Sequence, residues 1–180
     1  MAKSLNCVFI VGLVILITGC TSDGERSRRI SPSSNAEKMS LAEFKSASGS
    51  LSSDEIRQYY SDRTIMHFDP IHGTQVEYLD PDGTSYLWYP GNKVALRGYW
   101  SVEHAFSEKK LCYRYGANTY NPATRQSGGS KECEDLSVTV FFMTEIVPGD
   151  RFGLKSSRIP FVLEKSQTTI RALTEKAGRN

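Results

Sequence analysis

Potential metal ligands are concentrated in one short segment of the chain, from His67 to His72. Two of the three His residues flank Asp69 there. Imidazole nitrogens and carboxylate oxygens bind Zn²⁺, which can activate water for hydrolysis, and on a strand His67 and Asp69 would share a face. One hypothesis is therefore a metal site made by His67, Asp69 and His72. The alternative is a strand end and an Asp-Pro turn that hold no metal, since no fourth ligand or general base can be assigned.

No other pattern predicts a catalytic centre. The sequence contains no G-x-S-x-G motif for a nucleophilic Ser. Asp80 and Asp82 belong to a turn sequence, which explains them without the paired carboxylates of a glycosidase. We therefore assign no catalytic residue and no cofactor, and we favour a non-enzymatic protein while leaving the question of enzyme activity open.

Aromatic residues cluster between Tyr59 and Tyr120. In an extended segment Tyr86 and Trp88 share one face, and Leu87 and Tyr89 share the other. An exposed Tyr and Trp surface beside Arg side chains could stack on sugars or grip a peptide. The candidate binding residues are Tyr86, Trp88, Trp100, Arg97 and Arg114. The alternative is that the aromatic residues form core and cross-strand pairs.

The first twenty residues have the pattern of an export signal. Lys3 precedes a run from Cys7 to Ile17 that is apolar apart from Gly12. This run is too short for a helix that crosses the membrane, which needs about 20 apolar residues. A cleaved signal therefore fits better than a transmembrane anchor or a buried core helix.

The end of this run, Ile17-Thr18-Gly19-Cys20, resembles a bacterial lipobox. The resemblance implies a signal peptide at residues 1–19 and a diacylglyceryl group on Cys20, followed by acylation of the new amino terminus. Two or three acyl chains make a stable anchor, whereas one chain binds a membrane only marginally. Because Thr21 follows the Cys in place of Asp, the resemblance favours the outer membrane over the inner one. We expect the protein in the cell envelope, facing the periplasm, with the membrane as its partner.

The remaining Cys residues form one pair. Of the four Cys, Cys7 leaves with the signal and Cys20 carries lipid. Disulfides persist outside the cytoplasm, so we predict a bridge between Cys112 and Cys133. A free nucleophilic Cys112 or a Cys metal ligand is the alternative, but no C-x-x-C spacing supports it. The formal net charge of +2 provides no basic surface for nucleic acid, so we exclude that partner.

Two short helices are predicted after a polar tether at residues 20–39. Ser40 and Glu43 have the spacing of a capping box, and so do Ser52 and Glu55. The second box predicts a helix over 53–60, and Leu51 and Ile56 flank its start as a hydrophobic staple.

Beyond residue 62 the pattern is that of antiparallel strands. Asp80-Pro81-Asp82-Gly83 is a hairpin turn between strands at 75–79 and 84–89. Further strands are expected at 63–68, 93–100, 110–115, 136–143, 151–154 and 159–163. Turns at short spacing predict a mainly β fold, an antiparallel meander or small open barrel with one or two short N-terminal helices. This single domain spans residues 40–163, and residues 164–180 form a polar tail that is a weak helix or disordered.

Three motifs resemble a family of small secreted proteins from alphaproteobacteria: the segment from Tyr78 to Thr84, Gly98-Tyr99-Trp100, and Leu111-Cys112-Tyr113. The similarity covers residues 65–140. It implies an antiparallel β domain with a Cys pair and transfers no activity and no catalytic residue.

These features lead to a membrane-anchored envelope lipoprotein that binds a protein or a glycan through its β domain. The alternatives are a small metal-dependent hydrolase that uses the segment from His67 to His72, and a purely structural envelope component.

Overall fold

The computed structural model describes residues 36–105, 108–121 and 123–179. These residues belong to one compact unit. The predicted signal peptide, Cys20 and most of the tether lie outside the described residues. Within the described part of the chain, no helix has both the length and the apolar character needed to cross a membrane.

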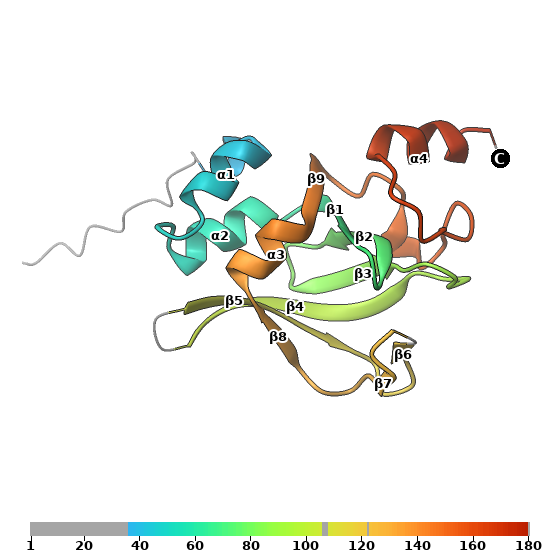
Figure 1. Cartoon of the computed structure of the whole chain (residues 1–180), viewed down its shortest axis with the longest axis horizontal. Helices are drawn as coiled ribbons and strands as arrows, with labels where there is room; N and C mark the ends of the chain where they lie inside the picture. Colours follow the sequence, from blue (N-terminus) through green and yellow to red (C-terminus); the bar gives the residue numbers. More distant parts are fainter. Residues whose placement is uncertain (1–35, 106–107, 122, 180) are drawn as a thin grey trace, which may run out of the picture. The chain divides into compact units, whose positions relative to one another are not determined.

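A seven-stranded antiparallel sheet forms the framework and curves into half a barrel (Figure 1). Its strand order is β8-β5-β4-β3-β2-β1-β9, so β1 to β5 form a continuous meander. The strands are β1 (Arg63–Asp69), β2 (Gly73–Leu79), β3 (Thr84–Trp88), β4 (Leu96–Ala105), β5 (Glu108–Tyr115), β8 (Glu132–Asp135) and β9 (Met143–Pro148). A small second sheet pairs β6 (Tyr120–Asn121) with β7 (Gln126–Ser127). The mainly β, open-barrel prediction is confirmed.

Both predicted N-terminal helices are present, after a short 3-10 helix η1 (Ala36–Lys38). Helix α1 (Leu41–Ala47) begins at Ser40, and α2 (Ser53–Tyr60) begins at Ser52. In each capping box the Ser hydroxyl accepts a hydrogen bond from the Glu backbone N–H, and the Glu carboxylate accepts one from the Ser backbone N–H. These bonds satisfy N–H groups that a helix start otherwise leaves without partners.

One face of the sheet is covered by helices, and we call it the helix-covered face. Helices α1, α2 and α3 (Leu136–Phe142) lie together over one part of the sheet in Figure 1. Their apolar residues pack with strand residues such as Ile65, Leu79 and Leu111 in one buried cluster. Leu51 and Ile56 both belong to this cluster, as the predicted staple requires.

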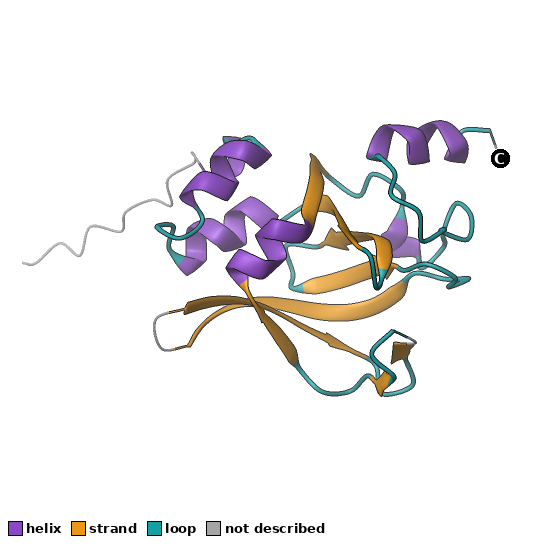
Figure 2. Cartoon of the chain, viewed as in Figure 1, coloured by secondary structure: helices purple, strands orange, loops and turns teal. Residues whose placement is uncertain are grey.

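The opposite face is covered by the C-terminal segment. Most of the chain between β9 and α4 (Ile170–Ala177) is loop, interrupted by the 3-10 helix η2 (Leu154–Ser156) (Figure 2). Leu154, Ile170 and Leu173 pack with strand residues, including Trp88, in a second buried cluster. The predicted strands at 151–154 and 159–163 are therefore wrong. Of the two alternatives for the tail, the helix is present, because two apolar residues three positions apart have a sheet face to cover.

The predicted strand at 136–143 is also wrong, because most of it forms α3. The β-branched Val138 and Val140 favour a strand locally. In the structure Leu136, Thr139 and Val140 are buried together, and this spacing of three and four residues belongs to a helix. The strand β9 begins only at Met143, so burial against the sheet overrides the local preference for a strand.

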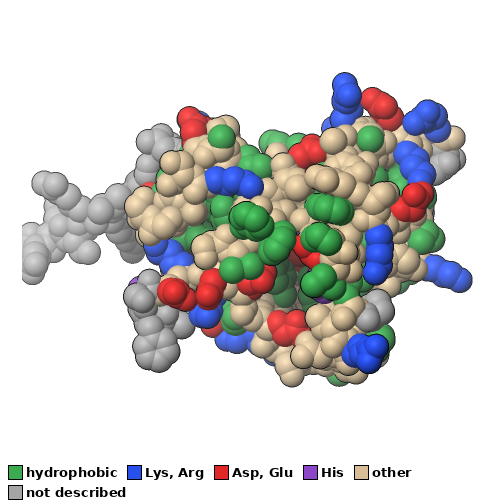
Figure 3. Space-filling view, viewed as in Figure 1, with side chains coloured by type: hydrophobic (Ala, Val, Ile, Leu, Met, Phe, Trp, Pro, Cys, Tyr) green, Lys and Arg blue, Asp and Glu red, His purple; other side chains and the backbone are tan. Residues whose placement is uncertain are grey.

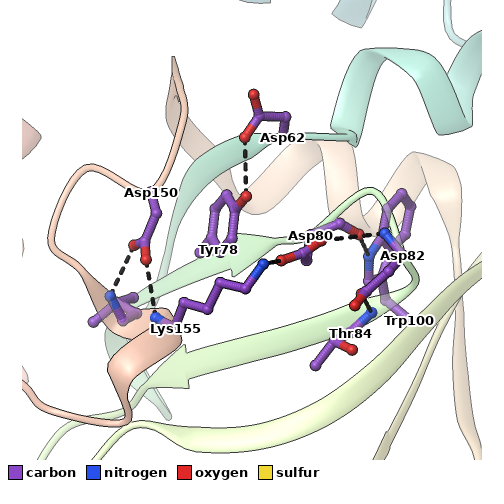
Figure 4. A network of polar contacts seen from close by, with 9 residues as sticks. Asp62, Tyr78, Asp80, Asp82, Thr84, Trp100, Asp150 and Lys155 are labelled. Carbon is purple, nitrogen blue, oxygen red and sulfur yellow. Dashed lines mark hydrogen bonds and ion pairs between the residues drawn. The ribbon is translucent and has the colours of Figure 1, made fainter.

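The predicted hairpin turn is tied to both faces of the sheet (Figure 4). The backbone oxygen of Asp80 accepts a hydrogen bond from Trp100 Nε1 at 2.9 Å. Its side chain forms an ion pair with Lys155 of η2. Asp150 accepts hydrogen bonds from the backbone N–H groups of Leu154 and Lys155 at 2.8 and 2.9 Å, which fixes the start of η2. The turn therefore connects the core under the helices to the segment that covers the other face.

The predicted disulfide is present between Cys112 and Cys133. The two residues are direct partners in the register of β5 and β8, with Cα atoms 4.0 Å apart. They are 21 residues apart in the sequence, and a cross-link over such a span contributes about 3 kcal/mol in the chain-entropy model. The bridge holds the short edge strand β8 against the sheet.

Candidate functional site

A cavity of about 530 Å³ lies on the helix-covered face. The strand residues that line it, such as His67, Leu96 and Tyr115, share the face of Ile65 and Trp100 by their register. Further walls come from the turn between β1 and β2, the edge strand β8, α3, and residues 119–121 and 124–128. Figure 3 shows a hollow near the centre of the molecule, bordered by hydrophobic and acidic side chains. The half-barrel therefore has an interior site beside the helices.

The three residues of the metal hypothesis all line this cavity. The Oδ1 atom of Asp69 accepts hydrogen bonds from the backbone N–H groups of Ile71 and His72, both at 2.8 Å. Asp69 therefore shapes the turn between β1 and β2. His67 lies two residues before Asp69 on β1, on the same face of the sheet, and its register partner on β2 is Gln75.

His67 is a half-buried, neutral side chain at the cavity wall. Burial lowers the pKa of its imidazole to about 4, and the positive charge of Lys45 lowers it further, whereas Asp69 has the opposite effect. Its Nε2 atom is buried and has no hydrogen-bond partner among the described residues. An unsatisfied buried polar atom costs free energy, so a ligand that reached it would gain from the contact.

A chain of hydrogen bonds fixes His72 at the other side of the cavity. His72 Nδ1 lies 2.9 Å from the hydroxyl of Tyr89, which lies 3.4 Å from Asn121 Oδ1. The Asn121 oxygen can only accept, and it also accepts from the backbone N–H of Ala123. His72 Nδ1 and Asn121 Oδ1 therefore both lie within reach of the single Tyr89 hydroxyl proton.

Acidic residues of β8 complete the wall. Glu132 and Glu134 line the cavity, and no Lys or Arg occurs among its described lining residues. Burial raises the pKa of Glu134, and the negative charge of Asp69 raises it further, whereas His72 lowers it. The carboxylates of Glu134 and Asp69 therefore act on each other across the cavity.

Glu77 lies next to the cavity and is buried. The hydroxyl of Tyr115, a lining residue, donates a hydrogen bond to Glu77 Oε1 at 2.7 Å. Burial raises the pKa of Glu77 to about 7, and the hydrogen bond from Tyr115 opposes this shift. In the sequence Glu77 is an ordinary polar residue of a predicted strand. Its burial depends on the segments that cover the sheet in the folded protein.

The structure corrects the prediction of an aromatic binding surface, because the aromatic side chains of that surface are buried. Tyr86, Trp88 and Trp100 are 7 %, 0 % and 3 % exposed, and they belong to two clusters on opposite faces of the sheet. Arg97 and Arg114 are exposed. They flank the ring of Tyr99, at 5.8 and 5.4 Å from its centre. The aromatic side chains are core because a sheet covered on both faces needs large apolar residues on both.

The metal hypothesis remains a prediction. Among the described residues, only Glu103, Cys112 and Cys133 bring three potential ligand atoms within 4.8 Å of one another. Both sulfurs of that group are in the disulfide. The ligand atoms of His67, Asp69 and His72 border one cavity without reaching this spacing in the described geometry.

Several lining residues had no signal in the sequence. Tyr89, Asn121 and Glu134 come from the residue after β3, from β6 and from the edge strand β8, which are distant in the chain. Comparison of the chain with models of protein families, with curated proteins and with solved structures gives no match. The resemblances to a lipobox and to a secreted family therefore remain predictions, and the cavity itself is the basis for inferring a function.

Replacement of Glu77 by Gln should remove a pH dependence of stability. The folded-state pKa of about 7 lies above the ordinary value of 4.5, so the folded state holds the proton more tightly. The free energy of unfolding should fall as the pH rises through this interval and stay lower above it, by on the order of 3 kcal/mol. Denaturant unfolding at pH 5 and pH 8 measures this difference.

The Glu77→Gln variant should lose most of the difference, because Gln still accepts the Tyr115 hydrogen bond but does not titrate. Glu175→Gln on α4, whose side chain is 62 % exposed, is the matched control and should keep it. An equal pH dependence in the Glu77→Gln protein would contradict the assignment.

Proposed function

We propose that this protein is a lipid-anchored lipoprotein of the cell envelope whose β domain binds a small polar molecule, such as a glycan fragment, without transforming it. The cavity on the helix-covered face carries this proposal. Its volume of about 530 Å³ lies in the usual range for ligand sites, about 300–1,000 Å³.

The lining of the cavity is suited to binding. Leu87, Leu96 and Phe142 supply apolar surface, and Gln75 and Asn121 supply amide groups. Ligand sites commonly combine an apolar wall with a few polar groups that set orientation. Because Asn121 and His72 are already held through Tyr89, a ligand would meet side chains that need little ordering.

A rigid sheet holds most of these groups. Lining residues occur on β1 to β5 and on β8, and β8 is attached to β5 by the disulfide. Sites built on strands keep their geometry better than sites on loops. Selective binding of a small molecule is therefore favoured over contact through a broad, flexible surface.

The anchor is proposed from the sequence. The segment Ile17-Thr18-Gly19-Cys20 and the polar residues that follow it would place the domain near a membrane surface on a tether. We propose the periplasmic face of the outer membrane, because Thr21 follows the Cys.

Filling the cavity should abolish binding. Leu96→Trp places an indole in the cavity wall, whereas Val94→Trp adds the same group at a position that is 53 % exposed and outside the lining. A panel of neutral saccharides, amino acids and alkylamines would be screened by amide chemical-shift perturbation. A binder should perturb Gln75 and Asn121 in the native and Val94→Trp proteins and leave the Leu96→Trp protein unperturbed. Binding that survives Leu96→Trp, or no binder at all, would contradict the proposal.

Loss of Cys20 should release the protein from membranes. Cys20→Ser removes the thiol that would accept diacylglycerol, so the variant should move from the detergent phase to the aqueous phase on phase separation. Mass spectrometry of the native protein should show an acylated Cys20 at the amino terminus. Unchanged partitioning of the variant would refute the anchor.

A metal-dependent hydrolase is the second candidate, and one observation favours it: His67, Asp69 and His72 line the same cavity. Titration with Zn²⁺ distinguishes it from the binding protein. Stoichiometric binding that perturbs the ring signals of His67 and His72, and that His72→Ala removes, would support the hydrolase. Absence of that binding at equimolar Zn²⁺ would exclude it. A structural envelope component is the remaining alternative, and it predicts neither ligand nor metal binding.

A further inference from the structure

We propose that the cavity takes an organic cation, a small molecule with an alkylammonium group, held between Asp69 and Glu134 and against tyrosine side chains. This inference rests on the proposed function and names its ligand class. It goes beyond the protein or glycan expected from the sequence, because the cavity offers negative charge and hydrogen-bond acceptors.

The hydroxyl protons of two tyrosines are used within the cavity wall. The Tyr115 hydroxyl donates its proton to Glu77 Oε1 at 2.7 Å. The single Tyr89 hydroxyl proton has two neighbours in the wall, Asn121 Oδ1 and His72 Nδ1. The Tyr89 and Tyr115 hydroxyls therefore have lone pairs, and no further protons, to offer a ligand. An ammonium group has three donors and no acceptor, which complements such a wall.

The charged side chains that line the cavity are acidic. Asp69, Glu132 and Glu134 line the cavity, and no Lys or Arg does so among the described lining residues. The Oδ2 atom of Asp69 has only a long contact, 3.4 Å from Gln75 Nε2, so it retains capacity to accept a stronger donor. A carboxylate or phosphate ligand would instead meet like charge, with no Lys or Arg among the described lining residues to pair with.

The pKa of Glu134 reflects the same excess of acidic side chains at the cavity. Burial and the negative charges of Asp69 and Asp135 raise the pKa of its carboxyl group, whereas His72 lowers it. A cation between the two carboxylates would offset their repulsion and favour the ionised form of Glu134. Cation binding should therefore weaken as the pH falls through the carboxyl range, because protonation removes the favourable charge.

His67 adds no positive charge to the cavity wall. It lines the cavity, and burial lowers the pKa of its imidazole to about 4, so the ring is neutral at pH 7. A neutral ring does not oppose a cation in the cavity.

Aromatic and apolar groups suit the rest of such a ligand. Tyr89, Tyr120 and Phe142 line the cavity, and aromatic faces attract ammonium groups. Leu87 and Leu96 offer apolar surface for an alkyl chain. The cavity therefore combines an anionic edge, aromatic faces and an apolar wall.

Calorimetric titration of the full-length protein, purified in a neutral detergent, tests this inference. The probes are putrescine and hexylammonium, with hexanoate and glucose as ligands of other classes, at physiological salt. We expect the two amines to bind and the other two probes not to bind. Glu134→Gln should weaken amine binding about tenfold, because a hydrogen bond to a charged partner is lost. Glu175→Gln, on the opposite face, should have no effect.

The outcomes separate this inference from the proposed function. Glucose or hexanoate binding that Leu96→Trp abolishes, with no amine binding, would overturn the cation and leave the cavity as a binding site. Failure of all four probes and of the wider panel would overturn both. Amine binding that survives Leu96→Trp, or equal affinities of Glu134→Gln and Glu175→Gln, would show non-specific attraction and overturn the cation site. Lower amine affinity at pH 5 than at pH 7.5 in the native protein, and a smaller pH effect in Glu134→Gln, would support it.

Discussion

An antiparallel sheet that curves without closing into a barrel leaves two faces and two edges open to solvent. The other elements of this protein cover its two faces. The helices α1, α2 and α3 cover part of one face, and the C-terminal segment with η2 and α4 covers the other. Both covers bury large apolar side chains, which stabilise a fold of this size. The part of the helix-covered face that the helices leave open is the cavity. The candidate site is therefore a consequence of how the sheet is covered.

Polar groups buried between the sheet and the segments that cover it cost free energy unless they form hydrogen bonds. Glu77 is stabilised in its neutral form by burial and is held by Tyr115. The hydroxyls of Tyr60, Tyr113 and Ser85 are buried and have no partner among the described residues. Natural cores rarely keep such groups without a reason.

Local chemistry explains which sequence predictions are confirmed. The helix starts at Ser40 and Ser52 depend on side chains three residues away, and the turn at Asp80 to Gly83 depends on four consecutive residues. Gly83 takes a φ of +89° there, which glycine adopts without strain. The Cys pair follows from elimination and from the oxidising compartment that the lipobox resemblance predicts. The errors at residues 136–143 and in the aromatic surface have a common cause, because in both cases burial by distant segments decided the outcome.

The sequence by itself determined the strand meander, the helix starts, the hairpin turn, the Cys pair and a segment rich in potential ligands. Each depends on interactions within a few residues or on a simple count. Only the tertiary structure decided that α3 is a helix, that Trp88 and Trp100 are core, and that His67, Tyr89, Asn121 and Glu134 surround one cavity. These residues come from strands and loops far apart in the chain. Their convergence depends on sheet curvature and on the covers of its two faces, and neither is encoded in local spacing.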